Sequence, residues 1–204
     1  MYNKRLKNHF LESSEEYVVS NDQQKRCSNV RNNQSDTLVI HPDDPTTDFL
    51  SEIYKGKGYN VVDDPLTGND TIAELIKDHK RIIALGHGCG FGLFGGLEMM
   101  ISSSLVSLLK DKELIFIWCN ADQFMMEHQL HGFYSGMFIS EVQEALIYGI
   151  STVQNTVTRS NNLFAAVLGR YIDGGDDILE NVKAEYFIEN DPVITFNRSR
   201  LYNT

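Results

Sequence analysis

Short apolar runs alternate with helix-like segments along most of this chain, and this alternation restricts the fold more than any other feature of the sequence. The apolar runs lie at 37–41, 59–64, 81–88 and 113–119. Segments with helix start and stop signals, or with apolar residues at helical spacing, lie at 45–58, 67–80, 101–112 and 138–149. Strands that are apolar throughout are typical of parallel sheets that helices cover on both faces. The sequence therefore predicts an α/β fold, a three-layer α/β/α sandwich with a mostly parallel sheet.

The same pattern continues to the end of the chain but does not reach its beginning. It predicts a strand at 149–154, a helix capped at Ser160 over 160–172, and a last strand at 191–199. Residues 1–36 are polar, with only short apolar groups. No repeat or Pro- and Ser-rich linker divides the remainder. We therefore expect an N-terminal extension at 1–36 and one domain at 37–204.

Charge and cysteine content restrict the partners and the compartment. The formal net charge of -10 argues against binding nucleic acid through its phosphates, which requires a basic face. The sequence contains no apolar run long enough to cross a membrane and no apolar signal segment, so a cytoplasmic protein without membrane contact is expected. Cys27, Cys89 and Cys119 are widely spaced and form no CxxC pair, which favours free thiols in a reducing compartment.

Side chains that can take part in catalysis lie where the predicted strands end. His41 ends the first strand and His87 the third, while the fourth ends in Cys119. In an open α/β sheet the functional residues gather at the carboxyl ends of the strands. His87 and Cys119 follow consecutive parallel strands, which often lie side by side, so an imidazole and a thiol are expected to face each other at one edge.

A thiol beside an imidazole is the arrangement that cysteine nucleophiles use. A cysteine of ordinary pKa, about 8.5, is mostly protonated at neutral pH, and a neighbouring histidine takes its proton or stabilises the thiolate. The backbone N–H groups of Gly88 and Cys119 could bind the oxyanion, because a glycine lets a substrate approach the main chain closely. The sequence thus predicts His87 as base and Cys119 as nucleophile.

The segments LGHG (85–88) and IFIWC (115–119) resemble the caspase-like, clan CD cysteine peptidases, which include caspases, metacaspases, legumains, gingipains and CHAT domains. The resemblance covers roughly residues 37–172. It implies a caspase-like fold and a cysteine endopeptidase that forms a thioester on Cys119, with His87 as base and Gly88 and Cys119 as oxyanion donors. It also implies a peptide or protein substrate and no cofactor.

This chain departs from better-known members at two points. Trp118 precedes the nucleophile where several members carry an acidic or polar residue, and Asn120 follows it. Specificity pockets in these peptidases usually depend on a charged side chain. Asp122 and Arg159 lie in loops suitable for substrate binding, and nothing in the sequence selects between them.

Other interpretations of the same residues remain open. GFGLFG (90–95) matches the G-x-G-x-x-G dinucleotide fingerprint, but it follows the third strand, and the next strand does not end in an acidic residue. Flavodoxin-like enzymes that cleave or transfer N-glycosidic bonds of nucleotides would instead use Asp63, Asp64 or Glu141. A non-catalytic caspase-like binding domain is a further alternative. His128 and His131 lack a third ligand for a metal.

Overall fold

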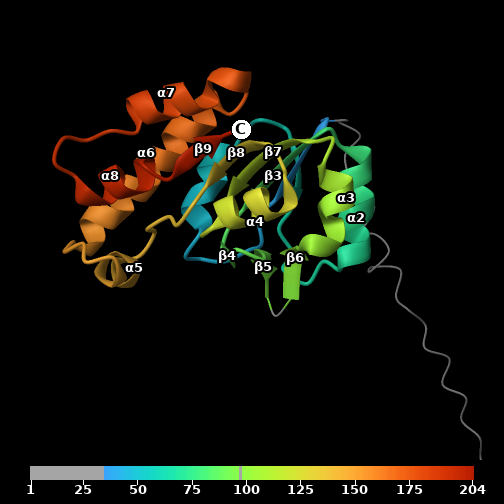
Figure 1. Cartoon of the computed structure of the whole chain (residues 1–204), viewed down its shortest axis with the longest axis horizontal. Helices are drawn as coiled ribbons and strands as arrows, with labels where there is room; N and C mark the ends of the chain where they lie inside the picture. Colours follow the sequence, from blue (N-terminus) through green and yellow to red (C-terminus); the bar gives the residue numbers. More distant parts are fainter. Residues whose placement is uncertain (1–34, 97) are drawn as a thin grey trace, which may run out of the picture. The chain divides into compact units, whose positions relative to one another are not determined.

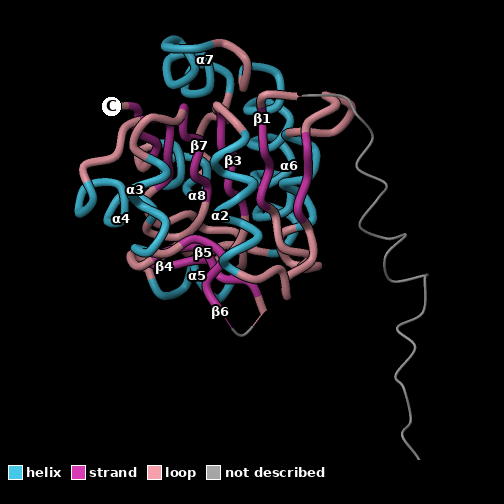
Figure 2. The backbone as a smooth tube through the Cα atoms, turned by 90° about the vertical axis from the view of Figure 1, so that its right-hand side faces the viewer, coloured by secondary structure: helices cyan, strands magenta, loops and turns pink. Residues whose placement is uncertain are grey.

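Six strands form the central sheet of the computed structural model, which describes residues 35–96 and 98–204 (Figures 1 and 2). Their order is β2 (Asn60–Val62), β1 (Thr37–Ile40), β3 (Arg81–Leu85), β7 (Glu113–Ile117), β8 (Gly132–Ser135) and β9 (Leu201–Asn203). All neighbours are parallel except β8 and β9, which pair antiparallel. The predicted α/β class and mostly parallel sheet are confirmed.

Helices cover both faces of this sheet, because alternate side chains of each buried strand point to opposite faces. On one face, α2 (Asn69–Asp78), α3 (Val106–Leu109) and α4 (Ala121–His128) pack on side chains such as Ile82 and Phe116. On the other face, η1 (Asp48–Ile53), α6 (Gln154–Tyr171) and α7 (Ile178–Glu185) pack on side chains such as Ile83 and Ile117. Burying each such side chain contributes about 1.5–3 kcal/mol.

A smaller core lies beyond the sheet and fixes the segment between β8 and α6. Ala145 of α5 (Val142–Ile147) and Val193 of α8 (Pro192–Arg198) pack there against Val157 of α6. Two further short 3-10 helices, η2 (Ser103–Leu105) and η3 (Gly175–Asp177), precede α3 and α7. This small core holds the loop before α5 in place next to the carboxyl ends of the central strands.

The glycine-rich segment after β3 forms a separate three-stranded antiparallel sheet of β4 (Gly88–Cys89), β5 (Gly92–Gly95) and β6 (Glu98–Ile101). Two of its glycines are required by close packing. A Cβ on Gly88 would lie 2.3 Å from the Trp118 ring, and one on Gly92, which has a φ of +146°, would lie 1.9 Å from the Ile101 carbonyl oxygen. The glycines therefore serve backbone packing.

Four sequence predictions are wrong in part or in full. Residues 191–199 form helix α8, because Asp191 caps it by accepting from Val193 N and Ile194 N and Pro192 occupies its first turn. Residues 150–153 pair with no strand in the described part of the chain. Helix α6 begins at Gln154, and Ser160 lies buried within it rather than capping it. The expected helix at 45–58 is the short 3-10 helix η1.

Strands β8 and β9 were not predicted, and β9, the last strand of the chain, forms the edge of the sheet beside β8. Apart from Ser35 and Asp36, the predicted extension at 1–36 lies outside the described residues, and so does Cys27. No helix within the described ranges is long and apolar enough to span a membrane.

Candidate active site

The carboxyl ends of β3 and β7 bring His87 and Cys119 to the same edge of the sheet. Leu85 and Ile117 are register partners in these adjacent parallel strands, and Gly86 N donates to the Ile117 carbonyl oxygen at 3.1 Å. His87 and Cys119 each lie two residues beyond that pair. Because both residues follow the same register pair by two positions, their side chains lie at the start of neighbouring loops.

Both side chains line a small cavity, here called the inner cavity, whose volume is about 20 Å³. Gly86 lines it beside His87, and Phe138 and Ser140 line it from the loop before α5. A cavity of this size has room for about one water molecule. The inner cavity therefore brings the predicted base and nucleophile together but leaves no space for a substrate without movement of its walls.

A hydrogen-bonded chain from Asp44 through Thr46 orients His87. The Thr46 hydroxyl donates to Asp44 Oδ1 at 2.7 Å, and Thr46 Oγ1 lies 2.6 Å from His87 Nε2. A hydroxyl has one hydrogen, and here it is directed at Asp44, so His87 Nε2 must be the donor in the second bond. This fixes the tautomer and leaves Nδ1 as the acceptor, and Nδ1 forms no hydrogen bond within the described residues.

His41, at the end of β1, holds the loop that carries Thr46. Its Nδ1 lies 3.0 Å from the Tyr54 hydroxyl and its Nε2 lies 3.3 Å from Thr47 Oγ1. Burial lowers the pKa of His41, so the ring is kept neutral and suited to these bonds. The Thr46 bonds to the Asp44 carboxylate lower the pKa of Asp44, which keeps that acceptor charged.

The Cys119 thiol bonds to groups other than His87 in this structure. Its Sγ lies 3.5 Å from the Phe138 carbonyl oxygen and 3.8 Å from Glu144 Oε1, and the single S–H is shared between these two acceptors. Burial and the nearby Glu144 carboxylate raise the pKa of Cys119 to about 12. The expected activation of the thiol by an imidazole is thus absent from this arrangement, because a carboxylate rather than His87 is its side-chain neighbour.

Glu144 is held firmly at this position by the loop that precedes α5. Its Oε2 accepts from Ser140 N at 2.7 Å, from the Ser140 hydroxyl at 3.1 Å and from Glu141 N at 3.0 Å. Glu141 in return accepts from Glu144 N, which completes a capping box. The resting position of the Cys119 thiol is therefore tied to the start of α5.

The two predicted oxyanion donors lie on different elements: Cys119 is at the turn between β7 and α4, and Gly88 begins β4. Asn120 has a left-handed backbone, with φ of 64°, so the chain turns sharply directly after Cys119. The Cys119 N–H forms no hydrogen bond within residues 35–96 and 98–204. Gly88 packs against Trp118, whose Nε1 donates to the Cys89 carbonyl oxygen at 3.1 Å. Trp118 is therefore an anchor for the small sheet.

The predicted substrate residues Asp122 and Arg159 lie outside the inner cavity. Asp122 is in the first turn of α4 beside Gly136, and its Oδ1 is buried without a partner in the described part of the chain. Arg159 lies on α6 and forms an ion pair with Asp191, with 2.7 Å between Arg159 Nη2 and Asp191 Oδ2. The structure thus places His87 and Cys119 on one cavity, whereas the two predicted substrate-binding residues, Asp122 and Arg159, do not line it.

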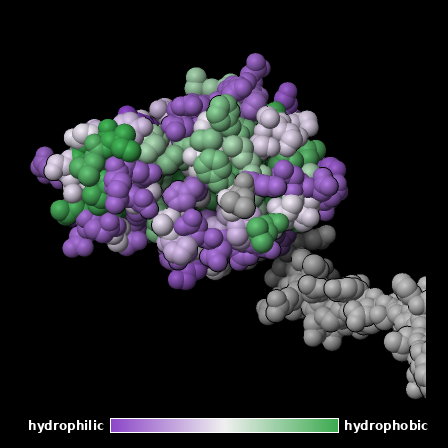
Figure 3. Space-filling view, turned by 90° about the horizontal axis from the view of Figure 1, so that it is seen from below, coloured by the Kyte–Doolittle hydropathy of each residue, from purple (hydrophilic) through white to green (hydrophobic). Residues whose placement is uncertain are grey.

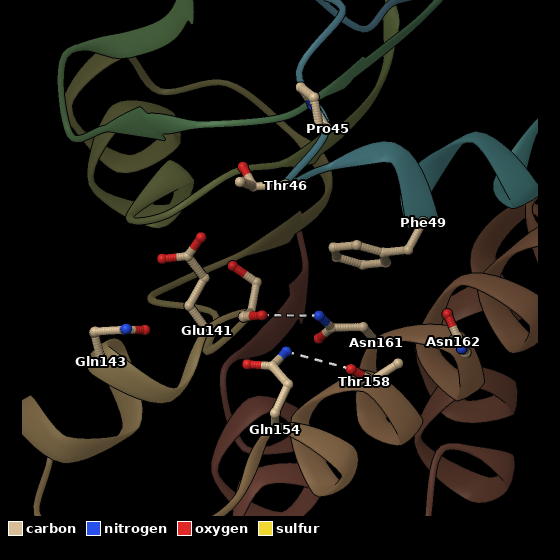
Figure 4. Close-up of a pocket in the computed structure, with 10 residues that line it drawn as sticks. Pro45, Thr46, Phe49, Glu141, Gln143, Gln154, Thr158, Asn161 and Asn162 are labelled. Carbon is tan, nitrogen blue, oxygen red and sulfur yellow. Dashed lines mark hydrogen bonds between the residues drawn. The ribbon is translucent and has the colours of Figure 1, made fainter.

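A larger opening, here called the outer cavity, adjoins the inner one and measures about 440 Å³ (Figure 4). Residues 45–49, residues 140–143 and the first half of α6 line it, and Phe49 and Ser140 line both cavities. Glu141 faces this space, whereas the Asp64 carboxylate binds Leu66 N in a turn. Within the described ranges, no group of three ligating side chains could hold a metal ion.

Sequence reasoning missed several residues that contact the predicted pair. Thr46 contacts His87, which is distant from it in the sequence, and the residues next to Thr46 in the sequence give no sign of this contact. The spacing of Glu141 and Glu144 is a visible helix-start signal, but that signal does not reveal the contact with Cys119. The small-sheet role of Trp118 also depends on packing that the sequence does not display.

Comparison with models of known protein families, with curated proteins and with solved structures gives no match.

Proposed function

We propose that this chain is a caspase-like cysteine peptidase in which His87 and Cys119 cleave peptide bonds. The observation that carries the proposal is that the adjacent ends of β3 and β7 place both side chains on the wall of one cavity. The order His-Gly and then Cys at neighbouring parallel strands is also what the resemblance implies. The free thiols Cys89 and Cys119 fit a reducing compartment, which supports a cytoplasmic location.

The reaction begins with proton transfer from the thiol to His87. Thr46 accepts from Nε2, so Nδ1 is the basic nitrogen, and Cys119 Sγ reaches it by turning away from Phe138 and Glu144. Catalytic hydrogen bonds often form only when a substrate is bound, so resting bonds from His87 and Cys119 to other groups are compatible with this role. Burial is the main cause of the raised pKa of Cys119, and turning away from Glu144 removes the further contribution of that carboxylate.

The remaining steps use the same groups. The thiolate attacks the substrate carbonyl carbon, and the Cys119 N–H stabilises the oxygen that becomes negative. His87 returns the proton to the leaving amine as the C–N bond breaks, which leaves a thioester. Water, deprotonated by His87, then hydrolyses the thioester to a carboxylic acid and restores the thiol.

Incubation with an unbiased library of acetylated peptides, analysed by mass spectrometry, tests this function. We expect the wild type to cleave peptides, Cys119→Ala to cleave none, and His87→Ala to lose roughly 100-fold or more of the rate. Cys89→Ala is the matched control and should retain activity, because the contact of Cys89 with Trp118 uses the backbone carbonyl. A thermal melt should show that all three variants fold.

The alternatives give different results in the same experiment. Cleavage that survives in Cys119→Ala would overturn the proposal. Thiol-independent release of a base from nucleotides would favour an N-glycosidic enzyme that uses Glu141, Asp63 or Asp64. Absence of any turnover by the wild type would favour a non-catalytic binding domain.

A further inference from the structure

The outer cavity adjoins the inner cavity that Cys119 lines, so a substrate whose scissile bond reaches Cys119 can extend into it. It shares Phe49 and Ser140 with the inner cavity, and its Thr46 holds His87. A volume of about 440 Å³ falls within the range of small ligand sites, about 300–1,000 Å³. The chemistry of its walls therefore indicates which substrate groups it accepts.

The walls of this cavity offer hydrogen-bond acceptors that lack donors. Asn161 is 6% exposed, and its Nδ2 donates to the Ser140 carbonyl oxygen at 2.9 Å, whereas its Oδ1 is buried and has no partner within the described residues. Gln154 Nε2 donates to Thr158 at 3.3 Å, which leaves the Gln154 carbonyl oxygen as an acceptor. The Glu141 carboxylate adds a negative charge to the opposite wall (Figure 4). A ligand rich in N–H donors would satisfy these groups.

An aromatic ring forms a further wall. Phe49, from η1, projects toward the space between η1 and the loop before α5 (Figure 4). A flat cation is attracted to the face of such a ring. A guanidinium group is flat, always charged and carries several N–H donors but no acceptor, so it matches a ring, a carboxylate and an amide oxygen together better than an ammonium does.

The surrounding edge of the sheet is negatively charged. The loops that follow the central strands, at 41–47, 63–68, 86–102, 118–120 and 136–141, contain no Lys or Arg. Their acidic residues are Asp43, Asp44, Asp63, Asp64, Glu98 and Glu141. The nearby Arg159 is already paired with Asp191. A cationic side chain is therefore attracted to this edge, and an acidic one is repelled.

We propose that the outer cavity is a specificity subsite that binds an arginine side chain of the substrate peptide. Phe49 lies against the guanidinium group, and Glu141 and the free oxygen of Asn161 accept its N–H groups. This inference rests on the proposed function, since only a peptidase site at Cys119 makes the cavity a substrate subsite. Lysine is a weaker ligand, and the neutral analogue citrulline is weaker still.

Binding to Cys119→Ala tests the subsite without any need for turnover. Fluorescence polarisation would compare acetylated, labelled hexapeptides that differ only in one central residue: arginine, lysine, citrulline or aspartate. We expect the arginine peptide to bind at least about tenfold more tightly than the citrulline peptide, because a hydrogen bond to a charged group is lost with the charge. Equal binding of these two peptides, or no binding of the arginine peptide, would overturn the inference.

Variants in the same Cys119→Ala protein locate the effect. Glu141→Gln should weaken the arginine peptide about tenfold and leave the citrulline peptide unchanged. Glu141→Asp keeps both the charge and the helix cap and should keep the preference, which separates charge from folding of α5. Glu180→Gln removes an exposed carboxylate from α7 and is the matched control, with no expected effect. An unchanged preference for arginine in Glu141→Gln would contradict the assignment.

Failure of the two proposals can be distinguished. An arginine preference in Cys119→Ala together with no cleavage by the wild type would overturn the peptidase and keep the arginine site. Peptide cleavage by the wild type that ignores arginine would keep the peptidase and overturn the subsite.

Discussion

At the scale of single residues, His87 depends on a hydroxyl 41 positions earlier in the chain. Replacing Thr46 by Val removes the acceptor of the Nε2 proton and breaks the link to Asp44. The ring is then free to place its proton on Nδ1, which would block transfer from the thiol. We expect kcat/KM for peptide cleavage to fall at least about tenfold, which is part of the ~10²–10⁴-fold that a positioned base contributes.

Thr46→Ser is the matched control for this prediction, because it keeps the hydroxyl and should keep most of the activity. A structural role alone would alter stability and not the pH dependence. The acidic limb of the kcat/KM profile should move in Thr46→Val and stay in place in Thr46→Ser. Unchanged kcat/KM in Thr46→Val would contradict the role of Thr46 in positioning His87.

The reactivity of the resting thiol gives a second residue-scale prediction. Glu144 contributes to the raised pKa of Cys119, which is about 12, so the thiol stays protonated at neutral and mildly alkaline pH. Glu144→Gln removes the negative charge, lowers this pKa and increases the thiolate fraction. Alkylation of Cys119 by iodoacetamide at fixed pH should become roughly three- to tenfold faster, which corresponds to a shift of up to about one pH unit.

Cys89 provides the internal control for this measurement, since mass mapping reports the alkylation of both thiols in one sample. Its rate should be the same in the wild type and in Glu144→Gln. Equal acceleration of both cysteines would indicate general loosening of the protein and would contradict the local electrostatic explanation.

The placement of His87 and Cys119 at one edge of the sheet could be predicted from the sequence, whereas the contacts of Thr46 and Glu144 with them could not. The first two follow directly after apolar strands, and strand ends meet at one edge of a parallel sheet. Thr46 and Glu144 reach the site only after their loops fold against those ends. The spare acceptor of Asn161 is likewise a property of packing, since any asparagine in a helix looks the same in sequence.

At the scale of elements, the small β4–β6 sheet depends on particular glycines. Gly92→Ala places a Cβ 1.9 Å from the Ile101 carbonyl oxygen at a φ of +146°. We expect a loss of about 1–3 kcal/mol in the free energy of unfolding, measured by urea denaturation. Gly68→Ala is the control, because its φ is -67° and no atom lies within 4 Å of an added Cβ. Equal stability of the two variants would contradict this account of the glycine-rich segment.

The sequence-based predictions were wrong at elements whose residue pattern fits more than one type of secondary structure. The apolar run in 191–199 suits a strand as well as a buried helix, and the N-cap at Asp191 and Pro192 decides for the helix. Strand β9 has three residues and depends on pairing with β8, so its own pattern is too short to predict. Longer strands such as β3 and β7 were predictable because each is buried at every position after its first residue.

At the scale of the whole described domain, charge differs between the two edges of the central sheet. Lys57, Lys80 and Lys112 precede strands at the amino edge, whereas the loops at the carboxyl edge contain only acidic charges. Figure 3 views the molecule from below, where hydrophilic and apolar side chains lie side by side on the surface. Phe91 and Phe94, from the glycine-rich segment after β3, are exposed. The parallel topology gathers the residues that follow the strands at one edge, and the sequence supplies only acidic charges there, so this polarity can be predicted once the strands are assigned.

This polarity predicts a salt effect on substrate capture. Raising the ionic strength from about 0.01 M to about 0.5 M screens charges separated by more than a few ångströms. We expect kcat/KM for arginine peptides to fall at least about threefold and that for citrulline peptides to stay nearly constant. The citrulline peptides control for general effects of salt on the enzyme. Parallel changes for both peptides would contradict steering by the acidic edge.

The pairing of His87 with Cys119 as a working nucleophile can be measured most directly by covalent capture. Peptidyl acyloxymethyl ketones are weak electrophiles that require an activated thiol, and intact mass with peptide mapping locates the adduct. The account predicts one adduct on Cys119 that is absent in His87→Ala and retained in Cys89→Ala. No adduct with basic, neutral or acidic reagents, or an adduct on Cys89 alone, would contradict it.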